Sequence, residues 1–225
     1  MSSTSTIPAE RRKRSMVGGD ISKKVARFGA RCKKLHGEAR FCILALTLVE
    51  PDMPSREITL LGNPILRTKC KPVNDVHTTE IRSCITDLRD TLTEFRKRNG
   101  FGRGIAAPQI GVSKQIIYTN FDYRGALINP RIVQRSRKTF TLWDDCFSFP
   151  DLLVKVVRHY SIAVSFQDEE GGRRNLKAIG AFAELLQHEI DHLHGILAID
   201  RAVDTRHIIL RSEFNKLSQK KNVVL

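Results

Sequence analysis

Residues 185–195 read LLQHEIDHLHG, and two histidines in this stretch, His188 and His192, lie four residues apart. Positions i and i+4 of an α-helix share one face, one turn apart, so both imidazoles can point toward the same metal ion. Glu189 follows the first histidine, at the edge of that face. This H-E-x-x-H pattern is typical of helices in which two histidines bind a metal and the glutamate handles a proton. The stretch predicts a metal-binding helix, whose third ligand must come from elsewhere.

The sequence around this helix predicts an α+β fold. Thr79–Asn99 carries apolar residues at spacings of three and four, which predicts a second amphipathic helix. The region between the two helices is rich in strand patterns such as Ser161–Phe166, which alternates apolar and polar residues. A last, exposed helix is expected over Thr205–Leu217. The order helix, strands, helix favours mostly antiparallel sheets packed around the central metal-binding helix that carries HExxH.

Residues 1–50 differ in composition from the rest of the chain. They contain eleven Lys and Arg against four Asp and Glu, a net charge of +7 out of +14 for all 225 residues. Ser and Thr cluster at the start, in MSSTST, as they do in organelle transit peptides. The alternative is a basic arm that contacts RNA, although no aromatic residues interleave the first basic run as a stacking surface needs. We expect a targeting leader over residues 1–50 and a single domain over residues 51–225.

The composition also excludes several classes of protein. No stretch approaches the roughly 18 consecutive apolar residues of a membrane-spanning helix. The five cysteines, at positions 32, 42, 70, 84 and 146, are odd in number and form no C-x-x-C pair. This pattern argues against a disulfide framework and against a zinc site built from cysteines alone. A reduced thiol is therefore available as a metal ligand.

Cys146, in LWDDCFSFP, is the more telling candidate for the third ligand. A thiolate is a strong ligand for zinc or ferrous iron, and mixed Cys/His sites with an open position are catalytic. None of the remaining histidines stands at a recognisable metalloprotease spacing downstream of the helix. A zinc endopeptidase is therefore the weaker alternative.

Three motifs, taken in order, resemble those of the peptide deformylase family. GRGIAAPQ (102–109) is close to the family's G-x-G-x-A-A-P-Q, and DDCFS (144–148) stands where the family has E-G-C-L-S. QHEIDH (187–192) matches Q-H-E-x-D-H in full. The resemblance covers about residues 57–205 and implies a deformylase-like catalytic domain within residues 51–225. It also implies the activity, which is metal-dependent hydrolysis of the formyl group from N-formylmethionine of nascent polypeptides, with release of formate.

The resemblance implies a role for each reactive group. The implied metal ligands are Cys146, His188 and His192, which would hold one Fe²⁺, with Zn²⁺, Ni²⁺ or Co²⁺ as possible substitutes. Glu189 would take a proton from water and later give it to the leaving amine. The side-chain amide of Gln109 and the backbone N–H of Phe147 would stabilise the oxyanion.

Substrate contacts are expected on the first motif and on the metal helix. Residues 181, 184 and 185 precede His188 by seven, four and three positions, so they share its face. The first and last of these are expected to form the wall of the methionine pocket, and Glu184 to reach its rim. Gly104 would keep the first loop tight enough for the substrate backbone to pair along it. The expected substrate-binding residues are Gly104, Arg103, Asp145, Ala181 and Leu185.

Three departures from the family pattern open an alternative. Asp144 replaces Glu with a shorter arm, for which Arg158 is a candidate ion-pair partner. Asp145 replaces Gly and adds a negative charge beside a metal ligand, and Arg103 stands where many members carry an apolar residue. The alternative is a deformylase-like metal-binding protein with weak or no deformylase activity, acting on ribosomes or nascent chains.

The same resemblance sets the expected partners and location. We expect N-formylmethionyl nascent peptides as substrates and leave open a contact with the organelle ribosome. Neither DNA nor a membrane is expected as a partner. A basic leader on a deformylase-like domain predicts a mitochondrial location, with the cytoplasm as the alternative.

Overall fold

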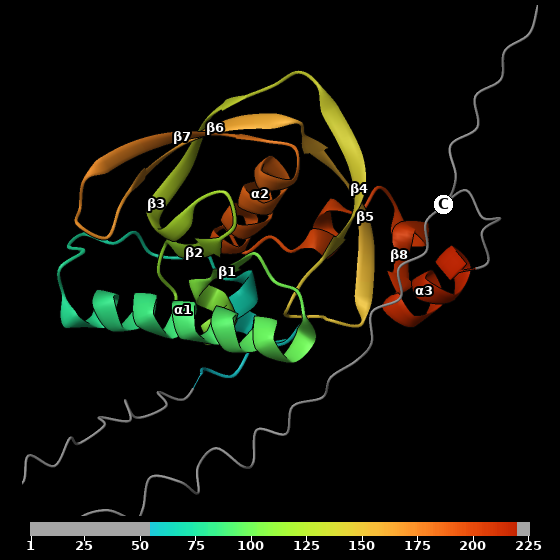
Figure 1. Ribbon diagram of the computed structural model, residues 1–225, viewed down its shortest axis with the longest axis horizontal. Helices are drawn as coiled ribbons and strands as arrows, with labels where there is room; N and C mark the ends of the chain where they lie inside the picture. The colour runs from blue at the N-terminus through green and yellow to red at the C-terminus, as the bar shows by residue number, and fades with distance from the viewer. Residues whose placement is uncertain (1–54, 220–225) are drawn as a thin grey trace, which may run out of the picture. The chain divides into compact units, whose positions relative to one another are not determined.

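The computed structural model describes residues 55–219, so the basic extension expected over 1–50 lies outside the described residues. Within that range, the helix α2 (Ala181–Leu193) lies in the interior, with a five-stranded and a three-stranded sheet around it (Figure 1). Every pair of strands in both sheets is antiparallel. The predicted α+β fold is therefore confirmed.

The larger sheet has the strand order β1-β2-β3-β6-β7. Its strands are β1 (Gly104–Ala106), β2 (Ile116–Asn120), β3 (Arg124–Arg135), β6 (Ser161–Gln167) and β7 (Arg173–Ile179). The smaller sheet has the order β4-β5-β8, and its strands are β4 (Thr139–Asp145), β5 (Leu152–His159) and β8 (Ile208–Leu210). Four 3₁₀-helices connect these elements, η2 (Pro64–Arg67), η3 (Ala107–Ile110), η4 (Ala198–Arg201) and η5 (Thr205–His207).

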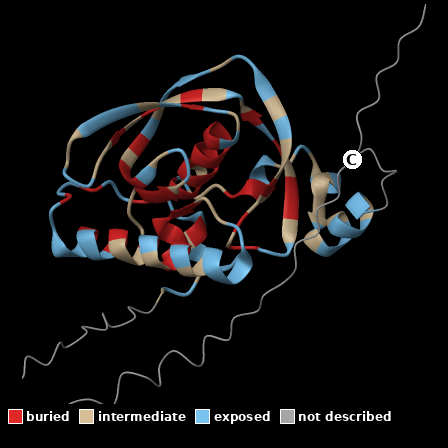
Figure 2. Ribbon diagram, viewed as in Figure 1, coloured by how far each residue is buried: buried red, intermediate tan, exposed pale blue. Residues whose placement is uncertain are grey.

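Helix α2 is buried along almost its whole length, as the red colour in Figure 2 shows. Its apolar side chains, including Leu186 and Ile190, pack in one core cluster with Leu127 and Phe166 of the larger sheet. Its polar side chains are buried as well, among them the two histidines and the glutamate of HExxH. Buried polar groups need partners, so the polar face of this helix is a candidate functional site.

Helix α1 (Thr79–Asn99) has the bounds that the apolar spacing predicts. The side chain of Thr78 accepts a hydrogen bond from the backbone N–H of Ile81 at its start. Gly100 ends the helix in the left-handed conformation, with φ of 76°, which suits glycine. The buried face of α1 contributes Leu88 and Leu92 to a second core cluster, shared with β1 and β2.

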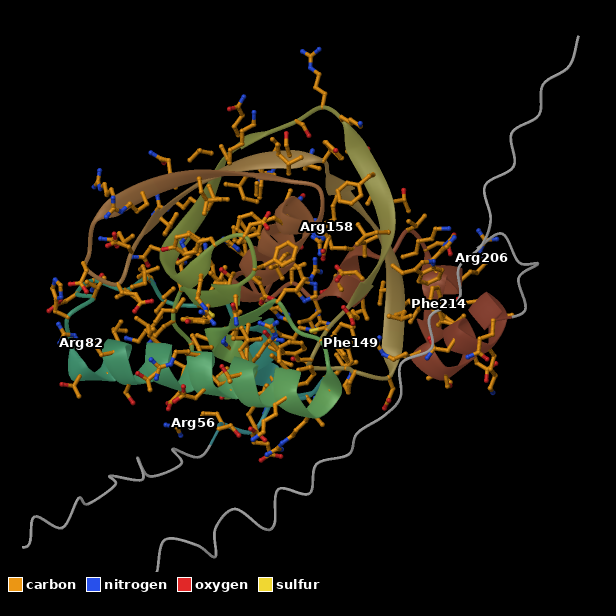
Figure 3. All side chains as sticks on the ribbon, in the orientation of Figure 1. Arg56, Arg82, Phe149, Arg158, Arg206 and Phe214 are labelled. Carbon is orange, nitrogen blue, oxygen red and sulfur yellow. The ribbon has the colours of Figure 1, made fainter. Side chains whose placement is uncertain are left out.

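The C-terminal region differs from the helix expected over Thr205–Leu217. Residues 205–207 form η5, residues 208–210 form β8, and only then does α3 (Arg211–Gln219) begin. β8 pairs with β5, with Ile209 opposite Leu153. This pairing outweighs the local helical pattern of residues 208–210. The helix itself is exposed, as expected, and contacts the body through Phe214 against Trp143 (Figure 3). No helix within residues 55–219 is both long and apolar enough to cross a membrane.

Candidate metal centre

Cys146, His188 and His192 converge at one buried point. The cysteine lies directly after β4, and the two histidines lie one turn apart on α2. The Sγ of Cys146 is 3.3 Å from Nε2 of His192, and the Nε2 atoms of the two histidines are 3.2 Å apart. All three residues are at most 5% exposed. The structure thus brings together the three ligands that the sequence motifs imply.

The donor set fits a transition metal. His188 has its Nδ1 within 2.9 Å of a carboxylate oxygen of Asp144, so Nδ1 carries the proton and Nε2 presents a lone pair to the cluster. His192 has a buried Nδ1 without a hydrogen-bond partner among the described residues. Its Nε2 lies close to the Sγ of Cys146 and to the Nε2 of His188, an arrangement expected if the three atoms bind one cation. One thiolate and two imidazoles suit zinc or ferrous iron and leave a fourth position open for water or substrate.

Asp144 lies at the centre of a buried ion-pair network behind His188. Arg158 (labelled in Figure 3) donates to Asp144 over 3.1 Å and also pairs with Asp191. Arg201 reaches Asp191 from the surface at 2.8 Å. Burial would raise the pKa of Asp144, but His188 and Arg158 outweigh it and lower that pKa to about 2. The network keeps the carboxylate ionised and fixes the orientation of the His188 ring, and it confirms the expected pairing with Arg158.

Glu189 lies beside the three donors without an ion-pair partner. Its Oε2 is buried and makes no hydrogen bond within residues 55–219. Burial raises the pKa of this carboxyl to about 7, so it can take up and release a proton near neutral pH. Gly104 of β1 faces it closely, since a Cβ there would lie 3.1 Å from Oε1 of Glu189 and 3.2 Å from Leu185. Glycine at this position lets the strand approach the helix.

Gln109 turns its amide toward the cysteine. Its Oε1 accepts a hydrogen bond of 2.9 Å from the backbone N–H of Ala106, which directs Nε2 the other way. Nε2 lies 3.6 Å from the Sγ of Cys146 and 3.4 Å from the Oγ of Ser148. The backbone N–H of Phe147 makes no hydrogen bond within the described part of the chain. Two N–H donors therefore flank the cysteine ligand.

A cavity of about 500 Å³ opens onto these groups. Its walls include Arg103, Gly104, Asp145 and Leu185, four of the five residues expected to bind substrate. Ala181 does not line the cavity, because it lies exposed at the first turn of α2, where its carbonyl accepts a hydrogen bond from Arg103. Five further wall residues were not among the predicted site residues, namely Arg96, Phe101, Gly102, Phe121 and Arg211.

The missed residues differ in how well the sequence marks them. Phe101 directly precedes the GRGIAAPQ motif, so its position beside the site could have been read from the chain. Arg211 comes from the start of α3 and carries no motif. It reaches the cavity because β8 pairs with β5, and its guanidinium lies 2.9 Å from the carboxylate of Asp145. Asp145 therefore points toward an arginine and is not one of the clustered metal donors.

Comparisons with known proteins agree with this geometry. The family model described as polypeptide deformylase matches residues 55–207. Peptide deformylase 2 of Prochlorococcus marinus (strain MIT 9313) is 34% identical over 165 residues, which cover 71% of this chain and 79% of that protein. A peptide deformylase of Halothermothrix orenii is 38% identical over 154 residues, covering 67% of this chain and 96% of that protein.

A solved structure supports the same assignment. The peptide deformylase of Synechococcus elongatus in complex with actinonin is 32% identical, with a TM-score of 0.62. The match covers 76% of this chain and 88% of that one. The family model, the relatives and the fold all point the same way, and the three motifs meet at one site. The chain belongs to the polypeptide deformylase family.

Proposed function

We propose that this chain hydrolyses the N-formyl group of N-formylmethionyl peptides, with release of formate. The observation that supports it best is the convergence of Cys146, His188 and His192 beside the unpaired carboxylate of Glu189. Cys146, His188 and the carboxylate-bearing Glu189 line the same cavity, and His192 lies directly behind them, with its Nε2 3.3 Å from the Sγ of Cys146. Hydrolysis of an amide by a metal-bound water requires a metal site with an open position and a proton acceptor. This arrangement of residues can supply both.

The residues of this chain supply the remaining steps of the reaction. When bound, the metal would lower the pKa of a water molecule and polarise the formyl oxygen. Glu189 takes the proton from that water at its unpaired carboxylate and returns it to the leaving amine, for which a pKa near neutrality is suited. The Nε2 of Gln109 and the backbone N–H of Phe147 donate hydrogen bonds to the oxygen that becomes negative.

The edge of the larger sheet can hold the substrate backbone. β1 is the terminal strand in the order β1-β2-β3-β6-β7, so one of its edges has no neighbouring strand in the described sheet. An extended peptide can add to such an edge through main-chain hydrogen bonds. Gly104 within this strand lies against Glu189, so a peptide bound there passes close to the proton acceptor.

We further propose ferrous iron as the working metal, with Zn²⁺, Ni²⁺ or Co²⁺ as substitutes. One thiolate and two imidazoles bind each of these ions, so the donor set supports all of them. Purification without oxygen, followed by metal analysis, distinguishes them. About one iron per chain with activity proportional to it supports the proposal, whereas full activity in an iron-free zinc form contradicts it.

The direct test of the function is formate release from formyl-Met-Ala-Ser, measured without oxygen and with iron restored. The acetylated peptide, followed by release of its free α-amino group because it contains no formyl group, is the matched control, since its larger acyl group should hinder access to a site built for formyl. Formate release that saturates with peptide is expected. Full metal loading without formate release would favour the alternative, a metal-binding protein of the same fold that contacts ribosomes or nascent chains.

The leader carries a separate proposal. Residues 1–50, with their net charge of +7, would direct the protein to the mitochondrion, where formylated nascent peptides and the organelle ribosome would be its partners. Fusion of residues 1–50 to a fluorescent protein tests this directly. Mitochondrial fluorescence is expected, and diffuse cytoplasmic fluorescence would contradict it. A fusion with the eleven Lys and Arg changed to Gln is the control.

A further inference from the structure

A buried ion pair forms one wall of the substrate cavity. The NH2 group of Arg103 donates to Oε2 of Glu184 over 2.7 Å, and NH1 donates to the carbonyl of Ala181 over 3.2 Å. The carboxylate side chain is only 4% exposed, whereas the arginine side chain is 34% exposed. Both residues line the cavity, and Glu184 lies one turn before the metal-site residue His188. A substrate side chain in the cavity therefore meets a charged wall.

The guanidinium of Arg103, which lines the cavity, has unused donors. Arginine carries five N–H groups, and Arg103 uses two of them in hydrogen bonds with described residues. Phe121 lies against the guanidinium, 5.6 Å from its central carbon to the ring centroid, so the ring fixes its plane without accepting a normal hydrogen bond. An apolar side chain that displaced water from those N–H groups would leave them without acceptors.

The ion pair between Arg103 and Glu184 also resists separation when a substrate enters the cavity. Glu184 is buried on a helix that is itself central to the core, so its carboxylate needs the arginine as a partner. Burial raises the pKa of Glu184, while Arg103 lowers it, so loss of the arginine would favour the neutral acid. The cavity wall remains polar when substrate binds, since pulling the arginine away would leave the buried carboxyl group of Glu184 without its hydrogen-bond partner.

The cavity charges restrict which acceptor can bind. Three carboxylates line it, from Asp145, Glu184 and Glu189, together with three arginines, Arg96, Arg103 and Arg211. The first two carboxylates are paired with arginines, and the third must cycle between charged and neutral forms in the proposed reaction. A substrate carboxylate bound to Arg103 would lie next to the Glu184 carboxylate that already neutralises this arginine, and the two like charges would repel where water is excluded. A neutral oxygen acceptor would bind the free N–H groups of Arg103 without that repulsion.

We propose that this cavity recognises a first side chain that carries a neutral oxygen acceptor, and that oxidised N-formylmethionine, the sulfoxide, is such a substrate. The inference rests on the proposed deformylase function. The sulfur of methionine is a weak acceptor, whereas the sulfoxide oxygen on the same side chain is a polar one. The proposal requires no redox step, because the substrate arrives already oxidised and only its formyl group is hydrolysed.

The experiment compares four formylated peptides that differ only in the first residue, in the iron-loaded full chain. The first residues are methionine sulfoxide, methionine, norleucine and glutamate. Norleucine has nearly the shape of methionine without an acceptor, and glutamate has an acceptor with a charge. We expect kcat/KM for the sulfoxide to exceed that for norleucine by about tenfold, with glutamate the slowest. Equilibrium binding of the four deformylated peptides gives the same ranking independently of turnover.

Variants assign the preference to the ion pair. Arg103→Leu with Glu184→Leu replaces both charges together, since removal of one alone would leave the other buried and unpaired. The tenfold preference for sulfoxide over norleucine should disappear or reverse. Arg103→Lys keeps the charge but loses the planar guanidinium, so it should lower the ratio of sulfoxide to norleucine kcat/KM about threefold. This single variant replaces the double variant as the test if the double variant does not fold. Arg174→Leu, an exposed arginine paired with Asp168 outside the cavity, should leave the ratio unchanged.

The outcomes separate this inference from the function on which it rests. A preference for norleucine in the parent chain overturns the inference, as does a sulfoxide preference that survives in the double variant. Formate release in either case leaves the deformylase function standing. If no peptide releases formate at full iron loading, the proposed function fails, and the binding ranking alone then decides whether the ion pair recognises a neutral acceptor.

Discussion

The carboxylate of Asp144 lies 2.9 Å from Nδ1 of His188 and 3.1 Å from the guanidinium of Arg158. It therefore connects a metal-site imidazole to the buried ion-pair network. A ring held in this way keeps Nε2 as the coordinating nitrogen and does not have to be ordered when metal binds. The shorter aspartate arm reaches the histidine, so the change from the family's Glu does not disconnect it.

Asp144→Asn should weaken metal binding without abolishing it. The amide can still contact the ring but no longer supplies the charge that makes the imidazole a stronger donor, and loss of such partners lowers metal affinity by about 10–100-fold. Competition with a chelator of known affinity measures the change. Asp122→Asn, an exposed aspartate, is the control. Equal affinities for the Asp144→Asn variant and the parent protein would contradict a role for this contact.

Cys146→Ala should remove most of the bound metal, because the thiolate is one of three donors that meet within 4.8 Å. His188→Ala and His192→Ala should do the same. Cys84→Ala is the matched control, since Cys84 is equally buried but lies in α1 within another core cluster. Metal content per chain after purification without oxygen is the measurement. Full stoichiometry in the Cys146 variant would show that the site is of another type.

Glu189→Gln should keep the metal and lose activity. The amide has nearly the same shape, but it cannot accept a proton, and a general base commonly contributes about 10²–10⁴-fold to the rate. Formate release per bound metal separates the two effects. Glu213→Gln, on the exposed face of α3, should behave as the parent. Unchanged turnover at equal metal content would remove Glu189 from the mechanism.

Arg211→Gln should lower kcat/KM by about three- to tenfold, because it frees the Asp145 carboxylate at the cavity, where negative charge opposes the developing oxyanion. Asp145→Asn alone should lie close to the parent, and the double variant should regain most of the loss. Arg206→Gln, which removes an exposed arginine paired with Asp204, is the control. Equal losses in the single and double variants would show that Arg211 acts through another contact.

Local pattern was enough to predict the elements with a strong periodic signal and the convergence of the three candidate metal donors. α1 and α2 follow from apolar spacing, and the metal donors follow from motifs that lie close in space because the family fold brings them together. Gln109 could be placed near the cysteine in the same way. These predictions succeed because short-range spacing and family motifs both restrict them.

The parts that could not be predicted depend on contacts between distant segments. The helix expected over Thr205–Leu217 was partly wrong, since β8 forms by pairing with a strand more than fifty residues earlier. Arg211, which lines the cavity, was missed for the same reason. Ala181 is not among the residues that line the cavity, because helical spacing identifies a shared face but not how far the cavity extends along it. The two ion pairs that line the cavity, Arg103 with Glu184 and Arg211 with Asp145, therefore could not be predicted from the sequence.

The pairing of β8 with β5 also sets an order of events during synthesis. Val154 lies opposite Ile208, and the strand that joins it is followed directly by Arg211, which lines the cavity. The metal donors, the last of which is His192, are translated earlier. A partly made chain can thus carry all its metal donors while Arg211, one of the residues that line the cavity, is still missing. The active site is therefore complete only after the ribosome has translated residue 211 and β8 has paired with β5.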